Sequence, residues 1–418
     1  MTRQARAWVE PVRESGSATT LELFFDLVFV FALTQVTAYL ADNLTGQGLL
    51  HGLLVLAVVW WCWVGYSWLS NVVKADEGVA RLAMFVAMLA MFVIALSIPE
   101  AFVDMPGGLS GPTVFAVGYL VLRGVHVLLF LMVSGTDPGL RRQVLRFTGT
   151  MIGGTALLLA AGMTSGSTQT LLWVAAVLAD YGGTLVIGAR GWRLNSARHF
   201  AERHGLIIIV ALGESIVAIG VGVAQLPISW PIVVAAALGL AVSASLWWVY
   251  FDTAALLSER ALSRARGEHR VAMARSGYTY LHMPMMVGIV LVALGLKKVL
   301  EYVGDEEHHT LADKLYGLPL WALYGGAALF LLGQVAFAWR CYRHMKVQRL
   351  VLAGVLIALI PLVAALPALA SLGVLAGLLA LLNVGESIKF AADRAAIRHG
   401  GHDEDPELLH VDRPADDP

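Results

Sequence analysis

Ionisable side chains inside long apolar stretches are the residues of this chain best suited to chemistry. Four acids, Asp26, Asp180, Glu214 and Glu386, lie in such stretches, and Arg123 lies near the middle of another. A charged side chain at the centre of a bilayer costs about 2.5–3.5 kcal/mol on insertion scales. Such groups therefore normally face the interior of a helix bundle, where they bind ions, relay protons or pair with one another.

Two more ionisable positions belong with this set. Glu22 precedes Asp26 by four residues, so a helix would place both carboxylates on one face. His282 stands shortly before Pro284, a residue that can bend a helix and free carbonyl groups to line a cavity. The candidate ion- or solute-binding residues are Glu22, Asp26, Arg123, Asp180, Glu214, His282 and Glu386.

The deep acids outnumber the deep bases, because Arg123 is the one basic residue in the middle of an apolar stretch. Uncompensated carboxylates in a low dielectric require protons, cations or water. This surplus predicts an interior that takes up protons or small cations. The structural alternative is that Arg123 pairs with Glu214 or Asp180 and simply holds helices together.

The elements that must position these residues are membrane-spanning helices. Of the 418 residues, 58% are hydrophobic and 14% are charged, whereas soluble proteins carry about 25% charged residues. The apolar stretches are long enough to cross a hydrocarbon layer about 30 Å thick as helix. The net charge of −1 gives no indication of a nucleic-acid partner, and two cysteines do not suggest a disulfide framework or a metal cluster.

The sequence therefore predicts an all-α, polytopic bundle of about twelve membrane-spanning helices in the lipid bilayer. The expected ranges are 21–40, 49–70, 81–99, 113–133, 146–163, 170–189, 205–224, 231–251, 277–297, 316–339, 349–366 and 369–390. Pro361 and Pro367 interrupt the last apolar run, which is too long for one helix, so a tight hairpin is expected there. Pro284 is expected to bend the helix over 277–297.

The basic residues indicate the orientation of these helices. Nearly all of the 29 Lys and Arg residues fall on one side of the predicted scheme, and the exceptions are Arg123, Lys297, Lys298 and Lys314. Cytoplasmic connections are rich in Lys and Arg. Both ends are therefore expected in the cytoplasm, with the chain in the inner (plasma) membrane. The polar N-terminal segment does not resemble a signal peptide.

The two halves of the chain look alike, which predicts two parallel six-helix repeats. Phe31–Gln35 in the first expected helix resembles Val210–Glu214 in the seventh, and paired tryptophans follow each. The expected domains are a cytoplasmic segment over 1–20, a first repeat over 21–189, a cytoplasmic linker over 190–204, a second repeat over 205–390 and a disordered acidic cytoplasmic tail over 391–418.

Common catalytic motifs are missing from the sequence. It contains no phosphate-binding Gly-x-x-x-x-Gly-Lys-Ser/Thr, no His-Glu-x-x-His and no Gly-x-Ser-x-Gly. The polar loop over 304–314 holds adjacent acids and histidines, but a solvated loop is favoured over a metal site. The sequence thus favours a protein that is not an enzyme, and it assigns no catalytic residue, cofactor or metal.

Three motifs resemble the bacterial low temperature requirement A family. They are ELFFDLVFVFALTQ at 22–35, ERHGL at 202–206 running into ALGESI at 211–216, and YTYLHMP at 278–284. The resemblance covers about 20–390 and implies a multipass membrane protein, with no catalytic residues to carry over. Phe25–Asp26 also resembles in part the first-helix motif of a lysosomal and bacterial potassium-channel family, whose arginine and serine are not matched here.

The buried acids favour a transporter or channel for a small cation, a proton or a proton-coupled solute. One alternative is a membrane enzyme or lipid-handling protein linked to cold adaptation, with Asp26 and His204 or His282 as acid and base. The other is a non-catalytic membrane scaffold or sensor. The sequence leaves the solute, the coupling ion and the oligomeric state open.

Overall fold

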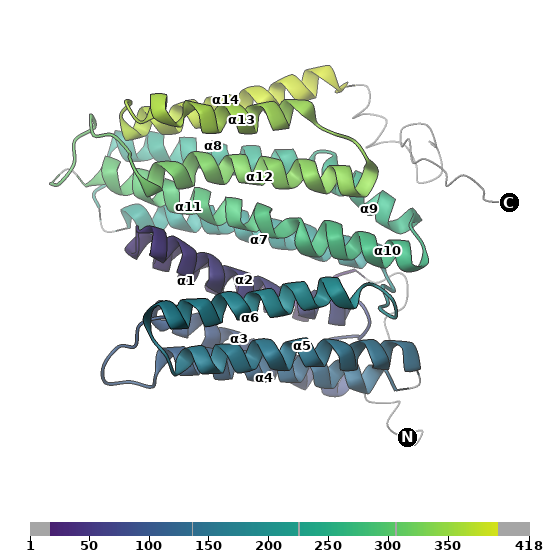
Figure 1. Cartoon of the computed structure of the whole chain (residues 1–418). Helices are drawn as coiled ribbons and strands as arrows, with labels where there is room; N and C mark the ends of the chain where they lie inside the picture. The colour runs from purple at the N-terminus through teal and green to yellow at the C-terminus, as the bar shows by residue number, and fades with distance from the viewer. Residues whose placement is uncertain (1–16, 136, 225, 306, 392–418) are drawn as a thin grey trace. The chain divides into compact units, whose positions relative to one another are not determined.

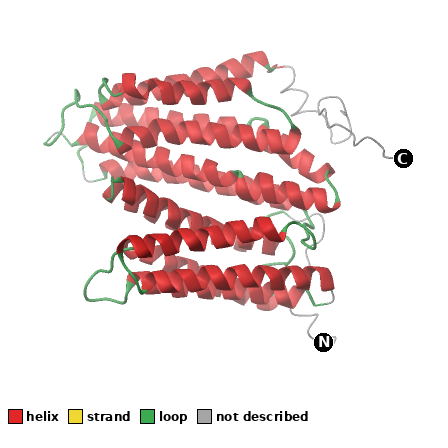
Figure 2. Cartoon of the chain, in the orientation of Figure 1, coloured by secondary structure: helices red, strands yellow, loops and turns green. Residues whose placement is uncertain are grey.

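Helices make up the regular structure of the described part of the chain. The computed structural model describes residues 17–135, 137–224, 226–305 and 307–391, and Figures 1 and 2 show helices joined by loops throughout them. The expected all-α class is confirmed. Most of the predicted N-terminal cytoplasmic segment and nearly all of the predicted acidic tail lie outside the described residues.

The chain divides into two compact units. Unit 1 comprises Met1–Ala218 and Gly267–Ala272, and unit 2 comprises Ile219–Arg266 and Met273–Pro418. Unit 1 contains α1 (Thr20–Asp42), α2 (Gly46–Ser70), α3 (Gly78–Ser97), the short 3₁₀ helix η2 (Ile98–Glu100), α4 (Gly111–Val133), α5 (Pro138–Gly162), α6 (Gly166–Ile187) and most of α7 (Ala197–Val223). Within it, α5 packs against α6, and α3 packs against both α1 and α4.

Unit 2 begins near the end of α7. It contains α8 (Trp230–Phe251), α9 (Ala254–Arg264), the end of α10 (Gly267–Met273), the π-helix η3 (Ala274–Tyr280), α11 (His282–Gly304), α12 (Leu318–Tyr342), α13 (Val347–Val363) and α14 (Ala368–Lys389). Within it, α11 packs against α12, α12 against α13, and α14 against α8. The prediction of two six-helix repeats stays a prediction.

The membrane-spanning character of the helices is confirmed. The described residues contain 11 helices that are long and apolar enough to cross a membrane, and α13 is a shorter apolar helix outside that count. The predicted hairpin at the end of the chain is present, because α13 ends at Val363 and α14 begins at Ala368. Pro367 is the N-cap of α14, where its missing N–H costs no helical hydrogen bond.

Three local features differ from the expected pattern. The fifth helix was expected from residue 146, but α5 begins at Pro138, where Asp137 caps it. The seventh helix was expected from residue 205, but α7 begins at Ala197 because polar residues of the predicted linker continue the helix. The helical irregularity expected at Pro284 lies earlier, in η3, where Leu281 N–H bonds to Ser276 O. Pro284 itself is in the first turn of α11, a position at which proline needs no bonded N–H.

Glycines allow α11 and α12 to approach closely. A Cβ added to Gly288 would lie 2.6 Å from the carbonyl oxygen of Gly326, and one added to Gly326 would lie 2.7 Å from that of Gly288. Neither helix can move a carbonyl aside without disturbing its own hydrogen bonds. Small residues at such contacts are typical of helix packing in membranes.

We expect Gly288→Ala to destabilise the protein by about 1–3 kcal/mol, because the added methyl group overpacks the helix contact. Thermal unfolding of the detergent-purified protein measures this effect. Gly325→Ala is the matched control, since a Cβ at Gly325 meets nothing within 4 Å. Equal unfolding temperatures for the two variants would contradict the close packing of α11 and α12.

Candidate functional site

Four ionisable residues form a buried charge group in unit 1, which we call the Arg203 cluster: Glu22, Asp26, His199 and Arg203. Arg203 Nη1 lies 3.0 Å from Glu22 Oε1, and its Nη2 lies 2.7 Å from Asp26 Oδ1. His199 Nε2 lies 3.0 Å from Glu22 Oε1. The side chains of Glu22, Asp26 and Arg203 are each 1% exposed. Two carboxylates therefore share one guanidinium away from solvent.

Local sequence explains why these groups meet. Glu22 and Asp26 lie four residues apart on α1, and His199 and Arg203 lie four residues apart on α7. Residues with this spacing share one helix face. Thr19 forms a capping box with Glu22, accepting from its backbone N–H and donating its own N–H to Glu22 Oε2 at 2.7 Å. The cap therefore starts α1 and orients the Glu22 carboxylate.

Trp63 of α2 completes the surroundings of Asp26. Its indole N–H donates to Asp26 Oδ1 at 2.8 Å, and the Arg203 guanidinium lies 5.7 Å from the centre of its ring. Asp26 Oδ1 thus receives two donors. Asp26 Oδ2 is buried and accepts no hydrogen bond from the residues that the structure describes. This oxygen can carry a proton.

Glu214 lies further along the same pair of helices. Thr34 Oγ1 of α1 donates to Glu214 Oε2 of α7 at 2.5 Å, and the Glu214 side chain is buried. Contacts run from Glu22 with His199, through Asp26 with Arg203, to Thr34 with Glu214. Both residue numbers rise together, so α1 and this part of α7 are parallel neighbours. Asp26 and Glu214 lie on this one seam in unit 1.

Arg123 and Asp180 form a separate buried pair in unit 1. Arg123 Nη2 of α4 lies 3.5 Å from Asp180 Oδ1 of α6, and Tyr119 donates its hydroxyl to Asp180 Oδ2. The guanidinium lies 4.9 Å from the centre of the Phe147 ring, a cation–π distance. A Cβ at Gly154 would lie 3.1 Å from Asp180, so glycine there leaves room for the carboxylate.

Glu386 belongs to a third group, in unit 2. Arg349 Nε donates to Glu386 Oε1 at 2.8 Å, and Arg349 Nη2 donates to Oε2 at 2.6 Å. The remaining Nη1 donates to Val249 O at 2.8 Å. This bidentate pair joins α13 to α14, and its third bond ties Arg349 to α8. One carboxylate here meets one guanidinium.

His282 lies apart from the acids of unit 2 that are named above. Its Nε2 is 2.8 Å from the Tyr250 hydroxyl, and its Nδ1 is 3.3 Å from Gly277 O in η3. Phe337 packs edge-on against the imidazole at 4.7 Å between ring centroids. This packed, hydrogen-bonded environment is suited to holding η3 in place.

The predicted surplus of deep acids is smaller than the sequence indicated. Arg203 and Arg349 were assigned to cytoplasmic connections, yet both are 1% exposed and both bind acids. The sequence signal for the burial of Arg203 is the matched four-residue spacing of Glu22–Asp26 and His199–Arg203. In the Arg203 cluster, two carboxylates still share one guanidinium.

The loop over 304–314 contains solvent-accessible histidine–acid contacts. His308 Nδ1 lies 3.0 Å from Asp305 Oδ2, and His309 Nδ1 lies 3.1 Å from Asp313 Oδ2. Among the residues searched, no group of three or more metal-ligating side chains is present.

The Asp305 carboxylate raises the pKa of His308 above its ordinary value, chiefly through their hydrogen bond. We expect Asp305→Asn to lower the pKa of His308 towards 6.5, since the acceptor charge is removed. An NMR titration of the imidazole measures this change. Asp313→Asn, which faces His309, is the control and should leave the His308 pKa unchanged.

The fold and the buried charges define a class, the polytopic α-helical membrane proteins with ion-paired interiors. A model of the bacterial low temperature requirement A protein matches residues 17–384. The chain belongs to this family. It is 29% identical over 334 residues to an uncharacterized protein of Rhizobium meliloti (strain 1021). The aligned region covers 77% of this chain and 76% of that protein. The resemblance of the three motifs is thus confirmed.

Proposed function

We propose that the protein is a proton-linked transporter in which the Arg203 cluster binds the proton. The observation that carries the proposal is that Glu22 and Asp26 share one guanidinium in a buried site. If both carboxylates are ionised and His199 is neutral, the cluster bears one uncompensated negative charge. Burying such a charge costs several kcal/mol, so one proton is expected to reside in the cluster.

Asp26 Oδ2 is the proposed proton-binding atom. Glu22 is fixed by four interactions, with Thr19, His199, Arg203 and the N-terminal end of α1, all of which favour a negative charge. Asp26 has donors on Oδ1 and none among the described residues on Oδ2. A proton that leaves Asp26 would strengthen its attraction to Arg203. Movement of that proton is therefore coupled to the contact between α1 and α7.

Glu214 is the proposed next proton acceptor. It lies on the same α1–α7 seam, and the hydroxyl of Thr34 donates to it. Asp26 and Thr34 are eight residues apart on α1, about 12 Å along the helix axis. This distance is too long for direct proton transfer, so water or a helix movement would have to connect the two acids.

The one-to-one pairs are assigned a bracing role. Arg349 with Glu386, and Arg123 with Asp180, each match one guanidinium to one carboxylate in a buried place. Neither pair carries a net charge that a proton would have to neutralise. This separates the seven sequence candidates into proton-handling groups on α1 and α7 and structural groups elsewhere.

Proton flux into proteoliposomes tests the proposal. Vesicles loaded with a pH-sensitive dye are given a sodium or a potassium gradient, and wild type is expected to change the internal pH faster than empty vesicles. Asp26→Asn should lower this rate at least tenfold, since the proton-binding oxygen is removed. The double variant Arg349→Met/Glu386→Met, which removes a neutral pair, should keep the wild-type rate. Equal rates for wild type and empty vesicles would reject the proposal.

Cytoplasmic location of both ends is part of the same proposal. It is supported by the one-sided distribution of Lys and Arg along the predicted helices. A reporter domain that is active only in the cytoplasm is expected to be active when it is fused to either end of the chain. A periplasmic signal from one end would show an odd number of spans.

A further inference from the structure

An open groove lies between α13 and α14 in unit 2. It has a volume of about 690 Å³. One wall comes from Val347, Val351 and Val355 of α13, and the other from Leu378 and Leu381 of α14. Most of these side chains are exposed although they are apolar. In a membrane protein such a surface contacts lipid.

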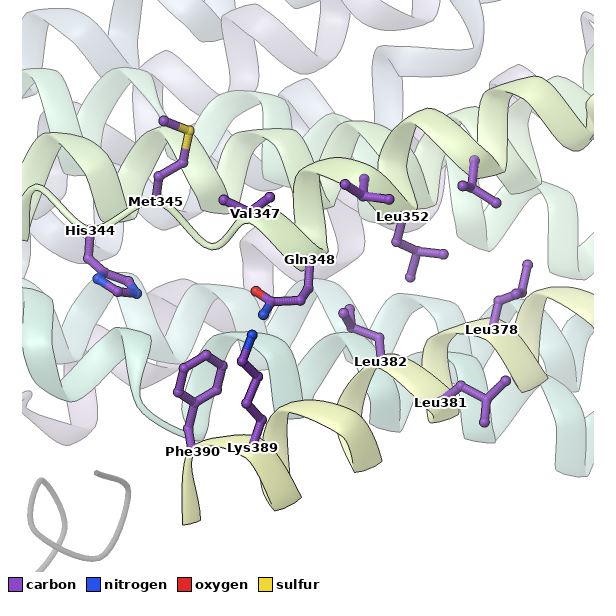
Figure 3. Close-up of a pocket in the computed structure, with 12 residues that line it drawn as sticks. His344, Met345, Val347, Gln348, Leu352, Leu378, Leu381, Leu382, Lys389 and Phe390 are labelled. Atoms are coloured by element: carbon purple, nitrogen blue, oxygen red, sulfur yellow. The ribbon is translucent and has the colours of Figure 1, made fainter. Parts of the chain in front are cut away.

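The groove has one polar end. Figure 3 shows Gln348 and Lys389 pointing toward one another, with His344 and Phe390 beside them and the leucines farther along. The lining contains Lys389 and His344 but no acidic residue. Lys346 Nζ also lies 4.7 Å from the centre of the Phe390 ring.

The nearby acid is already neutralised. Glu386, one turn before Lys389 on α14, is held in the bidentate pair with Arg349. Its charge is therefore taken up within the helix contact. The Lys389 ammonium at the polar end of the groove complements an anion.

The length of the groove matches half of a bilayer. From Leu378 to Lys389 the α14 axis advances roughly 16 Å at 1.5 Å per residue. A hydrocarbon core is about 30 Å thick, so this is close to the depth of one leaflet. A ligand that fits both the charge and the length has a negative head and an acyl chain.

We infer that the groove between α13 and α14 binds one anionic phospholipid, with its phosphate at Lys389 and Gln348 and an acyl chain along Leu378, Leu381 and Leu382. Basic pockets between membrane helices bind anionic head groups in this way. The site is independent of the Arg203 cluster. It would anchor the α13–α14 hairpin to one leaflet of the membrane.

Native mass spectrometry of the full-length protein in detergent tests the inference. The probes are phosphatidylglycerol and phosphatidylcholine with identical acyl chains, and wild type is expected to bind the first more tightly. Lys389→Gln should weaken phosphatidylglycerol binding about fivefold, the effect of one lysine near a charged surface. Lys314→Gln is the control, because Lys314 is exposed and outside the groove.

A second variant tests the acyl-chain part of the groove. Leu378→Trp fills it and should weaken the binding of both lipids while leaving the charge unchanged. Equal affinity of wild type for the two lipids, or equal effects of Lys389→Gln and Lys314→Gln, would overturn the inference. So would a change of oligomeric mass in Leu378→Trp with unchanged lipid binding, which would identify a second copy of the chain as the occupant.

Discussion

Arg203→Met is expected to lower the free energy of unfolding by about 3–5 kcal/mol, because it leaves Glu22 and Asp26 buried without their guanidinium. Methionine keeps much of the side-chain length, so lost packing contributes little to the change. Unfolding of the purified protein in detergent by heat or denaturant measures it. This is one of the two largest effects that the structure predicts for a single substitution.

The control for this variant lies on the same helix. Arg198 is exposed in α7, and Arg198→Met should change stability by less than about 0.5 kcal/mol. Replacing both acids as well, by Glu22→Gln and Asp26→Asn, should restore much of the loss, since no buried charge is then unpaired. A triple variant as unstable as Arg203→Met would show that the arginine acts through packing instead.

Arg349→Met is expected to cost a similar 3–5 kcal/mol, for a related reason in unit 2. It removes both bonds to Glu386 and the bond to Val249 O, leaving a buried carboxylate and a carbonyl without their donor. The hairpin of α13 and α14 then loses its polar link. Thermal unfolding and protease sensitivity of the hairpin both measure this loss.

The double variant Arg349→Met/Glu386→Met separates charge from structure. Two apolar side chains of similar length fill the same space, and such replacements of a buried pair are often neutral or stabilising. We therefore expect it to be more stable than Arg349→Met. Arg343→Met, an exposed arginine ahead of α13, serves as the control. If the double variant is the least stable of the three, the pair contributes more than charge neutralisation.

The helices could be predicted from the sequence because their apolar stretches match the thickness of a bilayer. The hairpin at Pro361 and Pro367 followed from the same pattern. The start of α7 could not be predicted, because Ala197–His204 is polar enough to resemble a loop. Its polar residues are helical because they pair with α1, and that contact joins segments far apart in the sequence.

The candidate site was found in part. Glu22 and Asp26 were chosen for their spacing, and they do share one face and one partner. That partner, Arg203, was counted among the cytoplasmic basic residues that set the orientation. The sequence rule assigns every arginine near a helix end to the membrane interface. It cannot distinguish an arginine that faces lipid head groups from an arginine that faces a buried acid.

Contacts between segments that are distant in sequence also distinguish Asp180 and Glu386 from Glu214. Asp180 and Glu386, like Glu214, lie in largely apolar segments with a glycine within two residues. The structure gives the first two a guanidinium each. Glu214 instead accepts from a hydroxyl of α1. The sequence around each acid does not show which side chain it contacts across helices, and the three-dimensional structure does.

The most direct test of the account is the protonation of Asp26 in the Arg203 cluster. In His199→Gln the cluster keeps two carboxylates and one guanidinium, so infrared spectra at pH 7 should contain the carbonyl band of a buried, protonated carboxylic acid. The double variant His199→Gln/Asp26→Asn leaves one carboxylate for one guanidinium, and its difference spectrum should show that band lost. Identical carbonyl regions for the two variants would contradict a protonated Asp26 in the Arg203 cluster and end the case for proton binding there.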